Sequence, residues 1–96
     1  MAEKIDSKIP KAKIEKYYKL TSKALKITRS SVSRGKKDVA DEIIKMVECY
    51  LSDSQHFFKK GDYVNSFAAL NYAHGWLDCG ARLKVFEVTD DSLFTV

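Results

Sequence analysis

Cysteine and proline are scarce in this chain of 96 residues, which contains two cysteines and one proline. Cys49 and Cys79 are too few for a disulfide scaffold, and neither has the close-spaced partner thiol that a zinc site needs. The sequence also lacks an apolar run long enough for a membrane span, and no signal-peptide core follows its charged N-terminal residues. We therefore expect a cytoplasmic protein that binds no membrane, metal or cofactor.

The length and composition predict one globular domain over residues 1–96. The chain is 45% hydrophobic and 31% charged, which is too apolar for a disordered chain, and it is too short for a second core. Its charge is unevenly distributed: residues 1–37 hold 12 Lys or Arg against three acidic residues, whereas residues 38–96 hold 5 against 10. The basic segment can attract polyanions or dock on the acidic remainder of the chain.

Hydrophobic periodicity predicts three helices, at residues 8–31, 38–60 and 62–83, followed by a short irregular C-terminal tail at 84–96. We expect Asp38 to cap the second helix. Gly61 followed by Asp62 places a helix-ending glycine next to a helix-capping aspartate, which predicts an antiparallel hairpin of the second and third helices. The expected fold is all-α, a three-helix up-and-down bundle.

Residues at spacings of three and four predict the faces that the first two helices bury. In the first helix they are Ile14, Tyr17, Tyr18, Thr21, Ala24, Leu25 and Thr28. In the second they are Val39, Ile43, Val47, Tyr50, Ser54 and Phe57, flanked by Ala40, Met46, Leu51 and Phe58.

The third helix differs because apolar residues cover most of its circumference. One face holds Tyr63, Phe67, Leu70, Ala73, Leu77 and Ala81, and a second holds Ala69, Tyr72, Trp76 and Cys79. A three-helix bundle can cover one of these faces, so Tyr72 and Trp76 need other cover. Either Leu93, Phe94 and Val96 of the tail fold back over them, or another chain packs there.

The string KGDYVNSFAALNYAHGWLDCGARLKVF, from Lys60 to Phe86, resembles the hallmark of a family of short archaeal proteins known as domain of unknown function 357. The similarity extends back through Met46, Tyr50 and Phe57 and forward to Leu93. The resemblance implies a three-helix up-and-down bundle of the albumin-binding-domain type, and it implies no activity.

A narrow polar strip on the third helix, Asn71, His74, Asp78 and Arg82, is the best candidate for chemistry. Asp78 can orient the His74 imidazole, and Arg82 can pair with Asp78, so the strip could serve a small-molecule or catalytic site. The alternative is that these groups satisfy one another and fix the helix register. We favour this structural interpretation because no nucleophile or metal partner accompanies the strip.

Two further groups of residues have simpler interpretations. Cys49, Asp53 and His56 are one ligand short of a closed tetrahedral metal site, and we expect them to be surface residues. The basic residues of the first helix, Lys16, Lys19, Lys23, Lys26 and Arg29, could follow a nucleic-acid backbone, but no base-reading element accompanies them.

These observations favour a non-enzymatic module that associates with itself or with a protein partner through Tyr72 and Trp76. The alternatives are nucleic-acid or ribosome binding through the basic first helix, and a small-molecule or catalytic site at His74, Asp78 and Arg82.

Overall fold

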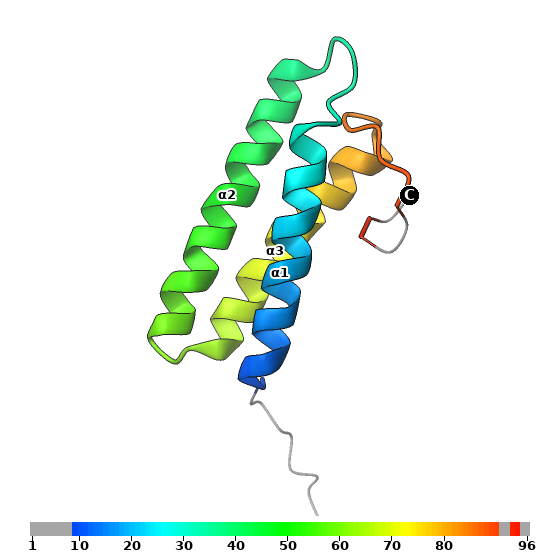
Figure 1. The fold of residues 1–96 in the computed structure, drawn as a ribbon. Coiled ribbons are helices and arrows are strands. Elements are labelled where there is room, and N and C mark those ends of the chain that lie inside the picture. Colours follow the sequence, from blue (N-terminus) through cyan, green and yellow to red (C-terminus); the bar gives the residue numbers. More distant parts are fainter. Residues whose placement is uncertain (1–8, 91–92, 95–96) are drawn as a thin grey trace, which may run out of the picture.

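Three antiparallel helices form the bundle in the computed structural model, which describes residues 9–90, 93 and 94. They are α1 (Lys11–Arg29), α2 (Lys37–Lys59) and α3 (Tyr63–Arg82). Figure 1 shows that α1 runs up, α2 down and α3 up again, as the sequence predicts. The described part of the chain contains no strand, and the all-α three-helix bundle is confirmed.

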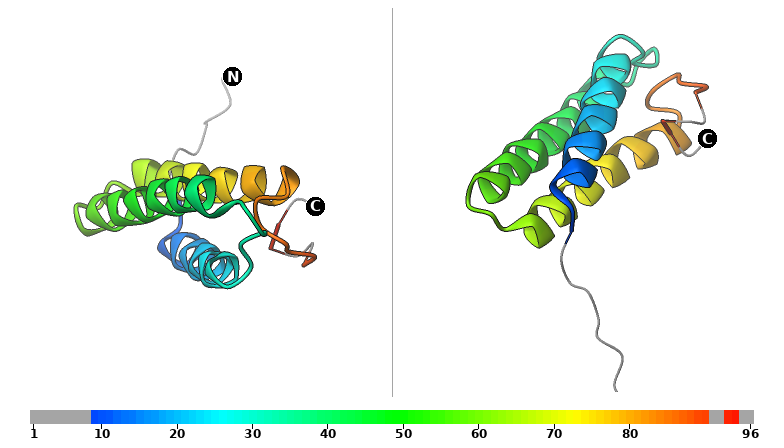
Figure 2. Two further views of the ribbon diagram at one scale, coloured as in Figure 1. Left: turned by 90° about the horizontal axis from the view of Figure 1, so that it is seen from above. Right: turned by 60° about the horizontal axis from the view of Figure 1, so that its bottom comes forward.

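The α2–α3 hairpin is the tightest part of the bundle, and α1 packs across it, mainly against α3. Figure 2 shows α2 and α3 side by side with α1 on one side of the pair. The hairpin turn is the predicted one. Gly61 has a φ of 78°, and the Asp62 carboxylate accepts a hydrogen bond of 3.1 Å from the backbone N–H of Asn65.

The core follows most of the predicted stripes. It includes Ile14, Ala24 and Leu25 of α1, Ile43, Val47 and Leu51 of α2, and Leu70, Ala73 and Leu77 of α3. Burying these apolar side chains is the main favourable contribution to folding.

Three predictions about the helices are wrong. Asp38 does not cap α2: the chain turns at Gly35, Lys36 holds the capping position, and Asp38 lies in the first turn. Val39 is exposed, since the buried stripe of α2 begins at Ala40 instead. Tyr17 is 38% exposed because it lies at the rim of the core. Its ring packs edge-on against Phe67 there.

The segment after α3 turns back over the top of the bundle. Phe86 is buried and forms an isolated antiparallel bridge with Val32, in the loop between α1 and α2. The backbone N–H of Ser33 donates to the carbonyl of Val85 at 2.9 Å, and that of Glu87 donates to the carbonyl of Ser31 at 2.7 Å. Leu93 and Phe94 are also buried, so the tail folds back onto the bundle. Val96 lies outside the described residues.

Candidate functional site

His74 fastens the tail to α3. Its Nε2 lies 2.7 Å from the carbonyl oxygen of Leu93, and its Nδ1 lies 3.3 Å from the hydroxyl oxygen of Thr21 on α1. Because a carbonyl only accepts, Nε2 carries the proton and donates, and Nδ1 then accepts from the Thr21 hydroxyl. In this arrangement the buried Thr21 hydroxyl occupies the Nδ1 lone pair, so neither ring nitrogen is open to take a proton from a bound molecule.

The rest of the polar strip divides into a half-buried and an exposed part. His74 and Asp78 are half-buried with 3.7 Å between Nε2 and Oδ1, whereas Asn71 and Arg82 are exposed. Arg82 lies one helical turn after Asp78 at the exposed end of the strip, and its pairing with Asp78 stays a prediction. A hollow of about 300 Å³ borders the strip, and Leu93 and Tyr17 form part of its wall.

The predicted second face of α3 remains largely uncovered in the single chain. Tyr72 is 62% exposed and Trp76 is 38% exposed, although the tail has folded back. The tail lies on the side of α3 that faces α1, at His74, and leaves these two rings open. Ala69, which the sequence placed on this second face, is buried in the bundle instead.

The exposed side of α3 consists of more than these two rings. We define the outer face of α3 as the residues that lie along this side: Val64, Ala68, Tyr72, Gly75, Trp76, Cys79 and Leu83. Val64 is 52% exposed and Leu83, just past the end of α3, is 67% exposed. Between residues 64 and 79 no exposed position of α3 carries a charged side chain. The outer face is therefore an uncharged surface, whereas most exposed positions of α1 and α2 carry charged side chains.

Contacts between α2 and α3 hold the outer face in place. The ring of Tyr50 on α2 stacks on that of Tyr72, with the ring centroids 5.5 Å apart. Below them, the buried hydroxyls of Ser54 and Ser66 lie 3.0 Å apart, and each donates to the backbone carbonyl of the other residue, at 2.9 and 2.8 Å. These reciprocal bonds fix the register of the two helices.

The basic side of the bundle is α1, which carries seven Lys or Arg against Glu15 alone. The predicted polyanion contacts Lys16, Lys19, Lys23, Lys26 and Arg29 are all exposed. In the described part of the chain one ion pair joins α1 to α2, from Arg29 to Glu48 at 2.8 Å. Docking on the acidic remainder of the chain therefore neutralises little of this charge.

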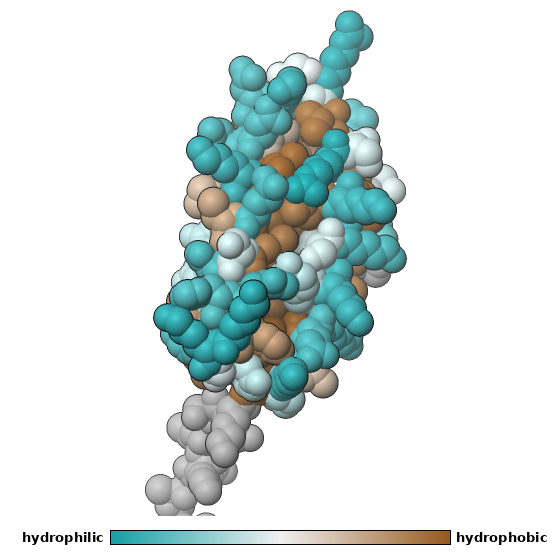
Figure 3. All heavy atoms as spheres, turned by 60° about the vertical axis from the view of Figure 1, so that its left-hand side comes forward, coloured by the Kyte–Doolittle hydropathy of each residue, from teal (hydrophilic) through white to brown (hydrophobic). Residues whose placement is uncertain are grey.

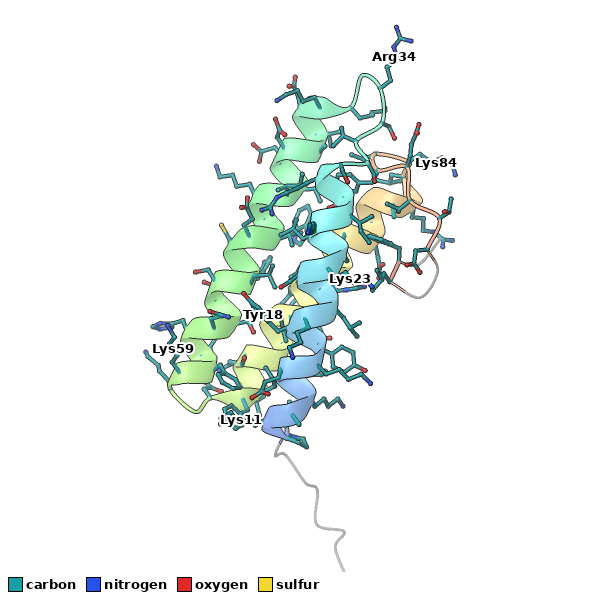
Figure 4. All side chains as sticks on the ribbon, viewed as in Figure 1. Lys11, Tyr18, Lys23, Arg34, Lys59 and Lys84 are labelled. Atoms are coloured by element: carbon teal, nitrogen blue, oxygen red, sulfur yellow. The ribbon has the colours of Figure 1, made fainter. Side chains whose placement is uncertain are left out.

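Figure 4 places the labelled cations at several points of the surface, with Arg34 extending from the loop between α1 and α2. Lys11 and Lys13, at the start of α1, lie over the rings of Phe58 and Phe67 at 5.7 and 5.1 Å from the centroids. At the start of α2, a hydrogen bond from Lys37 to Asp41 raises the pKa of Lys37.

An apolar groove runs between α1 and α2, which the sequence did not predict. Figure 3 shows it as an apolar strip between hydrophilic rims. A hollow of about 250 Å³ in this groove is lined by Ile14, Tyr18 and Phe58, with the Ser54 and Ser66 pair at its floor. Tyr18 also borders a second, wider hollow further along the same two helices.

Cys49, Asp53 and His56 are all exposed on α2, where the sequence placed them. No group of three potential metal ligands comes together within residues 9–90, 93 and 94. Over the same residues, no helix combines the length and apolar content needed to cross a bilayer.

Sequence reasoning missed the Ser54 and Ser66 pair and the packing of Phe86 on α3. Signals for both were present. Ser54 and Ser66 stand at buried positions of the helical period, and Gly80 leaves room on α3 six residues before Phe86.

Comparison with known proteins identifies a family and no activity. No curated protein and no solved structure matches the chain significantly. A family model described as "Protein of unknown function (DUF357)" matches residues 16–86, and the chain therefore belongs to this family.

Proposed function

We propose that this protein is a non-enzymatic helical module that associates with itself or with a protein partner through the outer face of α3. The observation that carries the proposal is the absence of charged side chains at the exposed positions of α3 from Val64 to Cys79, where Tyr72 and Trp76 are accessible. Tyrosine and tryptophan are enriched among the residues that contribute most to protein interfaces, and charged residues are depleted at interface centres.

The contrast between the three helices supports this choice of surface. Most exposed positions of α1 and α2 carry charged side chains, which keep those surfaces hydrated. The outer face of α3 has apolar groups that lose contact with water only when something packs on them.

The environment of His74 supports a role without catalysis. Its two ring nitrogens are engaged by Thr21 and by the tail at Leu93, so the imidazole serves to hold three segments together. We also propose a cytoplasmic location, since both cysteines are exposed free thiols, and an archaeal source, which rests on the resemblance of residues 60–86 alone.

Light scattering coupled to gel filtration, over a range of protein concentrations, tests association. We expect a mass that rises above that of one chain with concentration, and we expect Trp76→Glu to abolish the rise because it places a charge on the outer face. Tyr17→Glu is the matched control, since Tyr17 is also 38% exposed but lies on α1. If Trp76→Glu and Tyr17→Glu lower the measured mass equally, the result contradicts the assignment of association to the outer face of α3.

A second candidate function is the binding of a polyanion such as nucleic acid along α1. It is supported by the seven basic residues of α1, which stand against Glu15 alone; among the described residues, Arg29 is the one that forms an ion pair with another helix. Such binding depends on the release of counterions from phosphates and falls steeply with salt.

Fluorescence anisotropy with a labelled RNA duplex, between about 50 and 200 mM salt, tests this second function. We expect the double substitution Lys19→Glu and Lys23→Glu to weaken binding about tenfold or more and to flatten the salt dependence. Lys45→Glu with Lys60→Glu is the control, because it makes the same change in net charge at exposed positions outside α1. The absence of binding at low salt contradicts this function.

A further inference from the structure

The outer face of α3 has the spacing of a helix-pairing seam. Ala68, Tyr72, Gly75 and Cys79 follow one another on this face at intervals of three and four residues, as in the a and d positions of a heptad, and the same spacing continues beyond the face to Asn65 and Arg82. Val64, Trp76 and Leu83 flank this line. Gly75 is exposed, and a Cβ atom built on it meets no other atom within 4 Å, so the space above it is open.

We propose that two copies of this chain pair through their α3 helices in antiparallel orientation, with Tyr72 of each copy opposite Gly75 of the other. This inference rests on the proposed function and names the partner of the outer face. The same register places Ala68 opposite Cys79 and Val64 opposite Leu83. At the centre of the line the large ring of Tyr72 then meets a glycine, which is the arrangement that close helix packing requires.

Charge and size argue against the other self-pairings. In a parallel pair Tyr72 meets Tyr72, Gly75 meets Gly75, and the two Arg82 side chains come together. In the antiparallel register Arg82 lies opposite the uncharged Asn65. Pairing through α1 would bring two surfaces together that each carry seven basic residues against one acidic residue.

The size of the surface predicts a weak dimer. A helix of 20 residues is about 30 Å long and about 10 Å wide, so α3 alone offers roughly 300 Å² in projection. A standard interface buries about 800 Å² on each partner. Tyr50, stacked beside Tyr72, extends the contact, and we expect dissociation constants from micromolar to millimolar.

Disulfide trapping tests the register. The variant carries Ala68→Cys with Cys49→Ser and retains Cys79, and it is oxidised with oxidised glutathione at high protein concentration. We expect rapid formation of a covalent dimer, because position 68 of each copy lies opposite Cys79 of the other. In Cys49→Ser alone, the two Cys79 residues lie about 16 Å apart along the helices, and a disulfide needs Cα atoms within about 7 Å. That variant should therefore remain monomeric on gels for far longer.

Lys23→Cys with Cys49→Ser is the matched control, since it places the second thiol on exposed α1 and should not be trapped faster than Cys49→Ser alone. Rapid trapping of Cys49→Ser alone overturns the antiparallel orientation. A dimer that Trp76→Glu dissociates but that Ala68→Cys does not trap overturns the register and leaves the proposed function standing. A single-chain mass at every concentration, with no trapping, overturns the pairing of two copies, and the proposed function then requires a different protein partner.

Discussion

Phe86 packs directly on the backbone of Gly80. A Cβ atom at position 80 would lie 2.5 Å from Cε2 of the Phe86 ring, closer than real Cβ atoms approach a neighbour, and 3.2 Å from Cδ1 of Ile43. The missing side chain thus allows the segment after α3 to fold back over the last turns of the helix. This contact closes the top of the bundle and gives the first prediction.

Gly80→Ala should destabilise the protein by about 1–3 kcal/mol, because the ring of Phe86 must shift in a packed core. Gly75→Ala is the control: Gly75 is also helical but has open space around it, so the change should be neutral or stabilising by up to about 1 kcal/mol. Urea unfolding followed by circular dichroism measures both. Equal effects of the two substitutions contradict the close approach of Phe86.

Lys84→Gly should stabilise the protein by about 0.5–1 kcal/mol. Lys84 has a φ of 62°, in the left-handed region that favours glycine. Lys84 occupies the same position after the end of α3 that Gly61 occupies after the end of α2. In both places the N–H of the left-handed residue and the next N–H close back onto the last turn of the helix. Gly61→Ala should be destabilising by about 1 kcal/mol in the same unfolding experiment, and a loss of stability in Lys84→Gly contradicts the comparison.

His74→Leu should release the tail. The substitution leaves the carbonyl of Leu93 and the hydroxyl of Thr21 without their partner, which costs about 1–3 kcal/mol if both stay buried. Amide hydrogen exchange at Phe94, whose N–H donates to the carbonyl of Asp90, should become faster. Asn71→Leu, at an exposed position of the same helix, should leave that exchange rate unchanged. If the amide of Phe94 is equally protected in His74→Leu, the result contradicts the role of His74 in holding the tail against α3.

Ser54→Ala and Ser66→Ala should each be destabilising by about 1 kcal/mol or more, because each removes one of two reciprocal bonds and leaves a buried hydroxyl less well satisfied. The double substitution should cost less than the sum of the two, by roughly 0.5–3 kcal/mol, since the hydroxyls are in direct contact. A double-mutant cycle in urea measures this coupling. Strict additivity contradicts a shared hydrogen-bond unit.

The features that the sequence predicts correctly are local. The turn at Gly61 and Asp62 depends on neighbouring residues, and the buried stripes depend on a period that extends over a single helix. The prediction that Asp38 caps α2 is wrong because the left-handed turn at Gly35 determines where the helix begins, and it begins before Asp38.

The features that the sequence does not predict depend on residues far apart in the chain. Which side of α3 the tail covers is determined by hydrogen bonds of His74 to both Thr21 and Leu93. The polar strip was correctly placed on one helix face, but its burial depends on where α1 and the tail lie. Periodicity along one helix contains no information on that placement.

The bridge between Val32 and Phe86 also has a consequence for the order of folding. It joins residues at opposite ends of the α2–α3 hairpin, so it must close a long loop, whereas the hairpin itself closes a short one. Contacts of short sequence separation form at lower entropic cost, and we expect the hairpin to assemble first. We expect the bridge to form afterwards, when α1 packs on the hairpin, so that α1 and the segment around Phe86 become ordered last.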